Sequence, residues 1–339
     1  MTKLMQYANF VLKFGEQELL DEFEIVSRAF LHDVRVRSYG KTHFHFLEPK
    51  LKLLDQTDPM SLAIFGRFVK DTVLERDQVL DGGLLRQSHD ELRSSPSSYF
   101  VLMLASHRLV FLPETRFAPT LAQFAATTRK FLLDAHKDFI RDKFNVAQAA
   151  GERNTDGKKI TLKSLRALLP QPSLTVVPLK SDESIEAFLD RFELIKRVKV
   201  SLIDRNDEFD PMSTLENFQK GMLAPTNPKL ATLTLNADEE GLDKDGTTNL
   251  VRNITDYENE EIHITGVDEY GNELKGSNDS FKLQRTLFGN FESDDERASA
   301  MADSYLQLVE DGAVRNSLTS PEKRLSIREK LVGLMERYL

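Results

Sequence analysis

The sequence predicts an α+β protein, with mixed, mostly antiparallel sheets, flanking helices and two domains. Short apolar segments recur in closely spaced pairs with turn residues between them, which is the pattern of β-hairpins. Longer segments with apolar residues every three or four positions predict helices. The stretch 173–204, SLTVVPLKSDESIEAFLDRFELIKRVKVSLID, adds a strand–helix–strand unit. We expect this unit to begin the second domain.

The first domain is expected to span residues 1–170 and to combine hairpins with a long helix. Its predicted elements are a strand at Tyr7–Phe14, a helix at 16–32, a hairpin at 34–47 closed by Pro49, a strand pair at 62–69 and 72–79, a hairpin at 99–112 around Ser106-His107-Arg108, and a helix from about 117 to 144. Residues 148–159 are polar and contain Asp156-Gly157, so they predict a mobile loop or linker.

The second domain is expected to span residues 171–339. Its predicted elements are a strand at 174–179, a helix at 181–192, strands at 196–202 and 230–235, helices at 213–222 and 247–257, strands at 261–268 and 281–288 around a polar turn, and terminal helices at 294–310 and 321–339. In the strand at 196–202, Val198, Val200 and Leu202 alternate with polar residues. Such alternation predicts one buried and one solvated face.

Composition excludes several classes of site. The chain has no cysteine, so disulfides, thiolate catalysis and cysteine-ligated metals are excluded. No apolar run approaches the roughly 20 residues of a membrane helix, and the N-terminus lacks a signal-peptide pattern. We therefore expect a cytoplasmic protein with no membrane insertion, no cofactor and no metal.

Charge is distributed unevenly along the chain. The net charge of −9 argues against a uniformly basic nucleic-acid binder. Residues 116–170, however, contain 11 Lys and Arg against 5 Asp and Glu, whereas residues 201–320 contain 10 against 25. Both segments could be solvated faces, or the first could bind an anionic partner.

The basic segment contains the candidate DNA-binding residues. They are Arg129, Lys130, Lys137, Arg141 and Lys143 on the long helix, and Lys158, Lys159, Lys163 and Arg166 in or just after the predicted loop. At about 100° per residue, Lys130, Lys137 and Arg141 fall on one side of the helix. Such a stripe could bind phosphates without sequence preference. Asp134, Asp138 and Asp142 could instead pair with these cations as i, i+4 salt bridges along the helix.

Metal-dependent chemistry has weaker candidates. His43 and His45 share one face of a predicted strand, without a visible third ligand. The run from Asp238 to Gly246 does not have the ligand spacing of a calcium loop and predicts an acidic solvated loop. Asp204 and Asp207, with further carboxylates at Glu208 and Asp210, follow a strand and could hold Mg²⁺ in a nuclease. Glu273-Leu274-Lys275 has residues that such a site could use but is expected in a turn.

Five segments resemble, in order and spacing, the phage-exclusion proteins of the RexA type. They are YFVLMLASHRLVFLPETRF, APTLAQF, SLTVVPLKS, RVKVSL and ITGVDEYGNELKGSNDSFKLQ, between about residues 98 and 290. Proteins of this type are understood as dimeric, sequence-nonspecific DNA binders that act in defence against other phages. Their architecture is similar to that of the recombination-associated protein RdgC. The resemblance implies a similar role here and assigns no individual residue.

The leading hypothesis is therefore a non-enzymatic protein that binds double-stranded DNA without sequence preference in phage exclusion or anti-phage defence. We expect it to act as a homodimer, with a possible partner protein from a defence system. One alternative is a Mg²⁺-dependent nuclease that uses Asp204 and Asp207. Another is a protein-interaction module whose acidic C-terminal half binds a basic partner.

Overall fold

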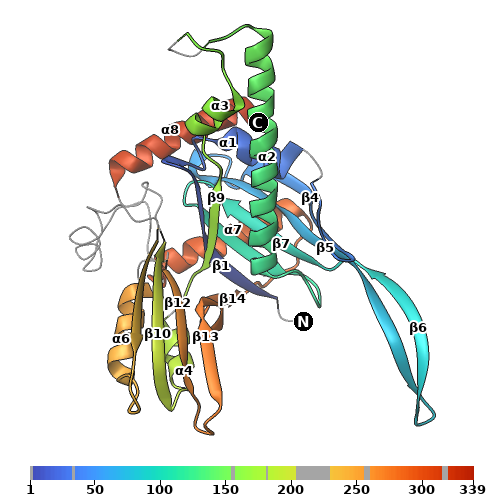
Figure 1. Ribbon diagram of the computed structural model, residues 1–339, viewed down its shortest axis with the longest axis vertical. Helices are drawn as coiled ribbons and strands as arrows, with labels where there is room; N and C mark the ends of the chain where they lie inside the picture. Colours follow the sequence, from blue (N-terminus) through green and yellow to red (C-terminus); the bar gives the residue numbers. More distant parts are fainter. Residues whose placement is uncertain are drawn as a thin grey trace.

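The computed structural model describes residues 3–32, 35–153, 157–180, 182–203, 230–255, 260–314 and 320–339. The architecture is α+β, as the sequence predicted. Within the described residues it contains a ten-stranded sheet and a separate four-stranded sheet, each flanked by helices (Figure 1). Every strand pair described in the two sheets is antiparallel.

The large sheet is built around β1, Leu4–Phe14. Successive side chains of this strand point to opposite faces of the sheet, and most are buried on both faces. The main strand order is β14 (Gln284–Thr286), β1, β8 (Arg108–Pro113), β7 (Ser97–Met103), β5 (Leu62–Asp81), β4 (Thr42–Leu53) and β3 (Arg37–Tyr39). In addition, β2 (Gln17–Glu18) and β9 (Ser173–Pro178) pair with β1, and β6 (Leu84–Ser94) pairs with β5. The buried hairpin predicted at 99–112 is confirmed as β7 and β8.

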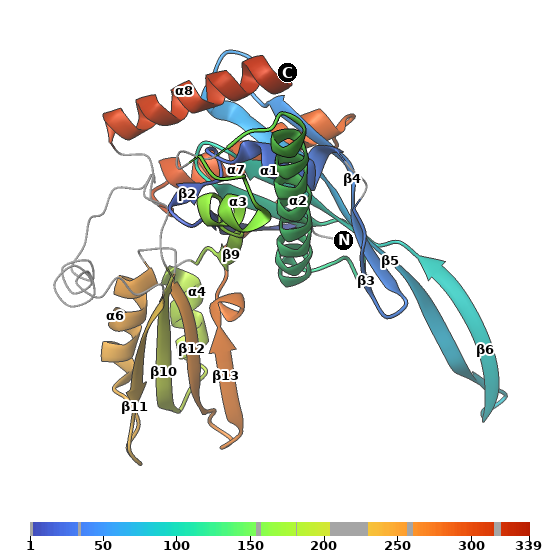
Figure 2. The same cartoon turned by 45° about the horizontal axis from the view of Figure 1, so that its top comes forward.

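Helices cover both faces of the large sheet. One face packs against α1 (Phe23–Ser27), its π-helical continuation η1 (Arg28–His32), α2 (Leu121–Ala149) and α8 (Pro321–Tyr338) (Figure 2). Phenylalanine rings fill this layer: Phe46 lies 5.2 Å from Phe100 and 5.7 Å from Phe124 between centroids. The opposite face packs against α7 (Asp294–Glu310). The same strands therefore contribute side chains to two apolar cores, one on each face of the sheet.

Charged groups hold the N-terminal end of α7 against the sheet. Arg67 donates from both Nη atoms to Asp294, at 2.7 and 2.8 Å, while Arg297 pairs with Glu114 at 2.5 Å. The hydroxyl of Tyr99 donates to the Asp294 carbonyl at 3.0 Å. Burial of Tyr99 raises the pKa of its hydroxyl, so the group stays a donor.

The small sheet forms a unit with its own core. Its strand order is β11 (Leu230–Asn236), β10 (Leu194–Ile203), β12 (Glu260–Val267) and β13 (Glu273–Ser277). On one face lie α4 (Asp182–Leu189) and α6 (Lys244–Thr255), whose apolar residues pack against Val198 and Val200. No described helix packs across the opposite face of this sheet, which is called the open face below. The half-buried strand predicted at 196–202 is thereby confirmed.

The strand–helix–strand unit of the sequence is divided between the two sheets. Its first strand, β9, pairs with β1 along Ala8–Lys13, while its second strand, β10, pairs with β11 and β12. β14 and the terminal helices also return to the large sheet. A division of the chain at Pro170 therefore does not coincide with the division between the sheets.

The predicted strand pair at 62–69 and 72–79 is wrong. Both segments belong to one strand, β5, which runs through Lys70-Asp71 and turns only at Gly82 and Gly83. Both glycines have positive φ, 57° and 82°, as a two-residue hairpin turn requires. The outer part of β5 and β6 forms a two-stranded arm, residues 72–94, that projects away from the body (Figure 1).

Other boundaries also differ from the predictions. The helix expected at 16–32 begins only at Phe23, because Gln17 and Glu18 fold back onto β1 around Gly15. β4 continues past Pro49 to Leu53 through an irregularity between Leu47 and Lys50. The strand expected at 281–288 is reduced to β14, and the helix expected at 213–222 lies outside the described residues. The remaining short elements are η2 (Pro59–Ser61), α3 (Leu162–Leu168) and η5 (Asn278–Ser280).

Candidate nucleic-acid interface

The long basic helix, α2, lies across the Phe-rich face of the large sheet and extends beyond it. Thr120 caps its N-terminus in a capping box with Gln123. Phe124, Phe131 and Ile140 bury its inner side. Beyond Ile140 only Ala147 is buried, so the last turns stand clear of the sheet. We call residues 141–153 and 157–168 the basic end; they contain these turns, the described part of the connecting loop and α3, and they form the top of Figure 1.

Lys130 and Lys137 lie on the exposed side of α2 and share one carboxylate. Lys130 Nζ lies 2.6 Å from Asp134 Oδ2, and Lys137 Nζ lies 3.8 Å from Asp134 Oδ1. Their side chains are 51% and 60% exposed. One carboxylate between two ammonium groups leaves a positive charge at this point of the helix, and exposed pairs of this kind contribute little stability.

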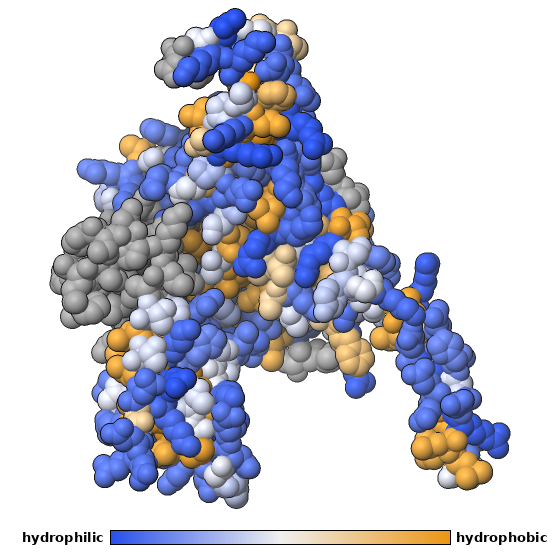
Figure 3. Space-filling view, in the orientation of Figure 1, coloured by the Kyte–Doolittle hydropathy of each residue, from blue (hydrophilic) through white to orange (hydrophobic). Residues whose placement is uncertain are grey.

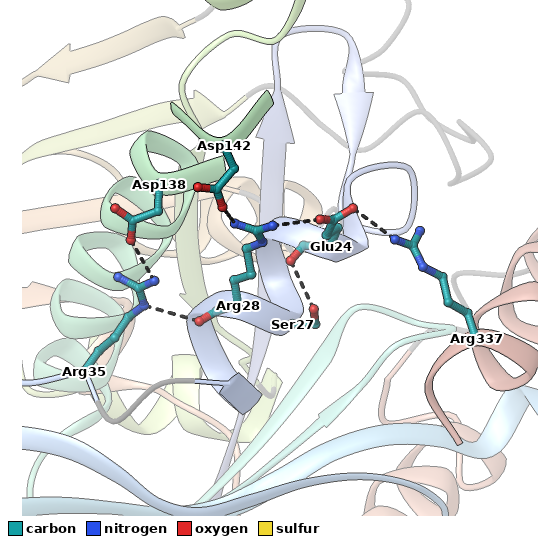
Figure 4. A network of polar contacts seen from close by, with 7 residues as sticks. All are labelled: Glu24, Ser27, Arg28, Arg35, Asp138, Asp142 and Arg337. Carbon is teal, nitrogen blue, oxygen red and sulfur yellow. Dashed lines mark hydrogen bonds and ion pairs between the residues drawn. The ribbon is translucent and has the colours of Figure 1, made fainter. Parts of the chain in front are cut away.

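The other two acidic residues of α2 do not neutralise the stripe. Asp138 Oδ2 accepts from Arg35 at 3.0 Å, and Asp142 Oδ2 accepts from Arg28 at 2.5 Å (Figure 4). Both arginines belong to the segment that begins at the end of α1. The predicted i, i+4 pairing along the helix is therefore realised only at Asp134.

This network also joins three helical segments. Glu24 accepts from Arg28 at 3.0 Å and from Arg337 of α8 at 3.0 Å, while Arg35 Nε donates to the Arg28 carbonyl at 3.2 Å (Figure 4). Sequence reasoning missed Arg28 and Arg35 as partners of α2, because they lie about 100 residues away and no helical spacing connects them. Their effect is to leave Arg141, which is exposed, without an ion pair to any described residue.

The remaining two helix candidates are held by other contacts. Arg129 donates from Nε and Nη2 to the Leu174 carbonyl of β9, at 3.3 and 2.9 Å, which fixes its guanidinium beside the sheet. Lys143 Nζ lies 5.3 Å from the centroid of the Phe139 ring. Both residues are exposed, but these contacts hold their side chains against the neighbouring structure.

The loop and α3 bring the other candidates to the same end of the molecule. Arg153 and Lys159 form an isolated β-bridge, and Gln148 donates to the Ile160 carbonyl at 3.0 Å. Thr161 caps α3. Lys158, Lys159, Lys163 and Arg166 are all exposed there. In the part of the chain that the structure describes, neither Lys163 nor Arg166 forms an ion pair.

The candidates for metal chemistry are placed as follows. His43 and His45 lie on β4, where Ser38 Oγ and His43 Nδ1 are 2.9 Å apart. Burial lowers the pKa of His45. Asp243, from the acidic loop, accepts from the Gly246 amide at 2.6 Å at the start of α6. Among the described residues, no three His, Asp or Glu are arranged to hold a metal ion.

Strand register separates Glu273 from the end of β10. Asp204 and Asp207 lie outside the described residues, directly after β10. Glu273-Leu274-Lys275 is on strand β13 and not in a turn, which corrects the prediction. Leu202 pairs with Glu260 at one end of β12, whereas Glu273 pairs with Val267 at the other end. Seven residues of strand separate these ends by roughly 23 Å, so β13 does not bring its carboxylate to the end of β10.

No protein-family model matches the chain, and no curated protein matches it in sequence. Among the described residues, no helix has both the length and the apolar character needed to cross a membrane.

Proposed function

We propose that this protein binds double-stranded DNA through its phosphates, without sequence preference, using the exposed side of α2 and the basic end. The observation that carries the proposal is that Asp138 and Asp142 pair with Arg35 and Arg28, and not with the cations of α2. Exposed cations therefore extend from Lys137 and Arg141 on α2 to Lys163 and Arg166 on α3. The resemblance to phage-exclusion proteins supports a role in defence against phages.

The test is a gel-shift titration of labelled duplex DNA at about 50 and 200 mM salt, with and without Mg²⁺. We expect reversible, salt-sensitive binding of intact DNA, because phosphate contacts release counterions. Combining Lys137→Glu with Arg141→Glu should weaken binding at 50 mM salt by more than about tenfold. No shift at either salt concentration would contradict the proposal and favour an acidic protein-interaction module, and cleavage with Mg²⁺ would favour the nuclease.

A matched control lies on α8. Arg324 and Arg328 are also four residues apart on an exposed helix side and form no ion pair with a described residue. Arg324→Glu with Arg328→Glu makes the same change in net charge as the α2 variant. Equal loss of binding in both variants would show that total charge, and not the α2 surface, controls affinity.

We further propose that the homodimer contact is made by the arm. Leu80, Leu84 and Leu85 at its tip are 70%, 66% and 71% exposed, and they form the orange end of the arm in Figure 3. Exposed apolar groups of this kind mark interaction sites. The arm contains five Asp and Glu against three Lys and Arg, so it does not suit phosphates or anionic lipids. A second copy presents the same leucines, and a twofold axis can pack the two tips together.

Light scattering after size-exclusion chromatography tests this contact. The wild-type protein should have the mass of a dimer, and the triple variant Leu80→Ser, Leu84→Ser, Leu85→Ser that of a monomer. Leu168→Ser, which changes an equally exposed leucine of α3, should remain dimeric. A monomeric wild type, or a triple variant that stays dimeric, would rule out the arm as the dimer contact.

A further inference from the structure

The open face of the small sheet is polar and contains cations in register. Its helix-covered face buries Val198 and Val200 of β10, so the alternate residues Arg197 and Lys199 point to the open side. Strand pairing aligns Asn236, Arg197, Thr265 and Lys275 in one row across the four strands. It aligns Thr234, Lys199, His263 and Ser277 in the next row. The two rows form a nearly continuous set of hydrogen-bond donors.

Charge within the small unit is segregated by face. Residues 182–203, 230–255 and 260–282 contain 16 Asp and Glu but only 8 Lys and Arg. The open face carries three of those cations, Arg197, Lys199 and Lys275, and two of the carboxylates, Glu261 and Glu273. The rest of the unit therefore has 14 carboxylates against 5 cations. An ordinary solvated sheet in so acidic a unit would be acidic too, so this distribution points to an anionic ligand.

The contacts of these cations leave donors available. Arg197 Nε donates to Asn236 Oδ1 at 2.7 Å, which orients the guanidinium. Its Nη atoms form no hydrogen bond with a described residue. Lys275 lies 2.9 Å from Glu273, at an exposed pair. Lys199 forms no ion pair within the described ranges.

The open face adjoins the α2 surface. A cleft of about 190 Å³ lies between them, lined by Ala122 and Ala125 of α2, by β9, and by Glu261, His263 and Ser277. Arg129 follows Ala125 by one helical turn, and the α2 stripe continues from there. Figures 1 and 3 show α2 and the open sheet on the same side of the molecule, as a largely hydrophilic surface.

We propose that the open face of the small sheet is a second phosphate-binding surface, which contacts the same DNA duplex as α2. The described strands place no Phe, Tyr or Trp side chain on this face, so it lacks the large rings on which unpaired bases usually stack. Phosphates of a duplex are the ligand that its cations and hydroxyls fit. This inference rests on the proposed function. It extends the DNA contact from α2, which packs on the large sheet, to the open face of the small sheet.

The test is the salt dependence of duplex binding, measured by fluorescence anisotropy between about 50 and 200 mM salt. Each lost phosphate contact should lower the slope of log affinity against log salt by about 0.9. Arg197→Gln with Lys199→Gln should therefore reduce the ratio of affinities at the two salt concentrations about tenfold. Arg324→Gln with Arg328→Gln is the control and should keep the wild-type slope.

The outcomes separate this inference from the proposed function. An unchanged slope in the sheet variant, with a reduced slope in Lys137→Gln with Arg141→Gln, would overturn the second surface and leave the first. A reduced slope in the sheet variant alone would support the second surface and overturn the α2 surface. Absence of duplex binding by the wild type would overturn both. Lys275→Gln, at an exposed position, provides an independent variant that should lower the slope by about 0.9.

Discussion

Gly66 shows how one residue accommodates an irregular neighbouring strand. A Cβ built at Gly66 would lie 2.9 Å from Pro49 Cα and 3.2 Å from the Leu47 carbonyl oxygen. Both are backbone atoms at the irregularity in β4, so they cannot move aside as a flexible side chain could. The absence of a side chain at Gly66 allows β4 to continue past Pro49.

We expect Gly66→Ala to lower the free energy of unfolding by about 1–3 kcal/mol, because overpacking against backbone forces a local shift. Chemical denaturation measures this change. Gly333→Ala on α8 is the control: nothing lies within 4 Å of its added Cβ. It should stabilise by about 0.5–1 kcal/mol, since alanine favours helix. Equal effects of the two substitutions would show that the contact with β4 is unimportant.

His45 should make stability depend on pH. Burial lowers its pKa in the folded protein below the ordinary 6.5, partly offset by Asp71. The unfolded chain therefore binds a proton at higher pH than the folded chain does. The stabilising effect of neutral His45 is present at pH values above the unfolded pKa of about 6.5, and it is lost as the pH falls from there through the lower pKa of the folded protein.

Thermal unfolding between pH 7.5 and 5 tests the role of His45. Tm should fall on acidification in the wild type and fall less in His45→Gln. His89, on the exposed arm, is 70% exposed, and His89→Gln should retain the wild-type pH profile. A His45→Gln profile that follows the wild type would exclude this histidine as the source.

At the scale of elements, the arm should be dispensable for folding. None of its side chains, all of which are described, is buried. We expect replacement of residues 74–92 by an Asn-Gly turn to leave Tm of the monomer unchanged within about 2 °C. A two-residue turn can connect Val73 to Arg93, because these residues are paired across the two strands. A large loss of stability would mean that the arm supports the body.

The arm also marks the limit of prediction from sequence. Alternation predicted β1 and β10, and two continuously apolar segments predicted the β7–β8 hairpin, because each of these strands buries at least one face. The outer part of β5 buries neither face, so no hydrophobic period distinguished it from a turn at Lys70-Asp71. The same limit applied to α2: the helical period placed Lys137 and Arg141 together, but the distant partners Arg28 and Arg35 had no local signal.

At the scale of the whole molecule, the two sheets have separate apolar cores. The core of the small unit contains Phe188, Val198 and Ile264 and shares no buried residue with the two cores of the large sheet. The chain passes into this unit after β9 and returns to the large sheet at β14. Such an arrangement predicts that the small unit can open without unfolding the large sheet.

Phe188→Ala tests this independence. Phe188 is 4% exposed, packs at 5.3 Å from Phe192 and 5.7 Å from Phe281, and lies directly over Gly276. Its truncation should destabilise the small unit by about 3–5 kcal/mol. Hydrogen exchange followed by mass spectrometry should then show faster exchange in β10 and β12, with β1, β7 and β8 unchanged. Equal loss of protection in both sheets would mean that the two sheets unfold as one unit. DNA that contacts both α2 and the open face of the small sheet would then bind a single rigid body.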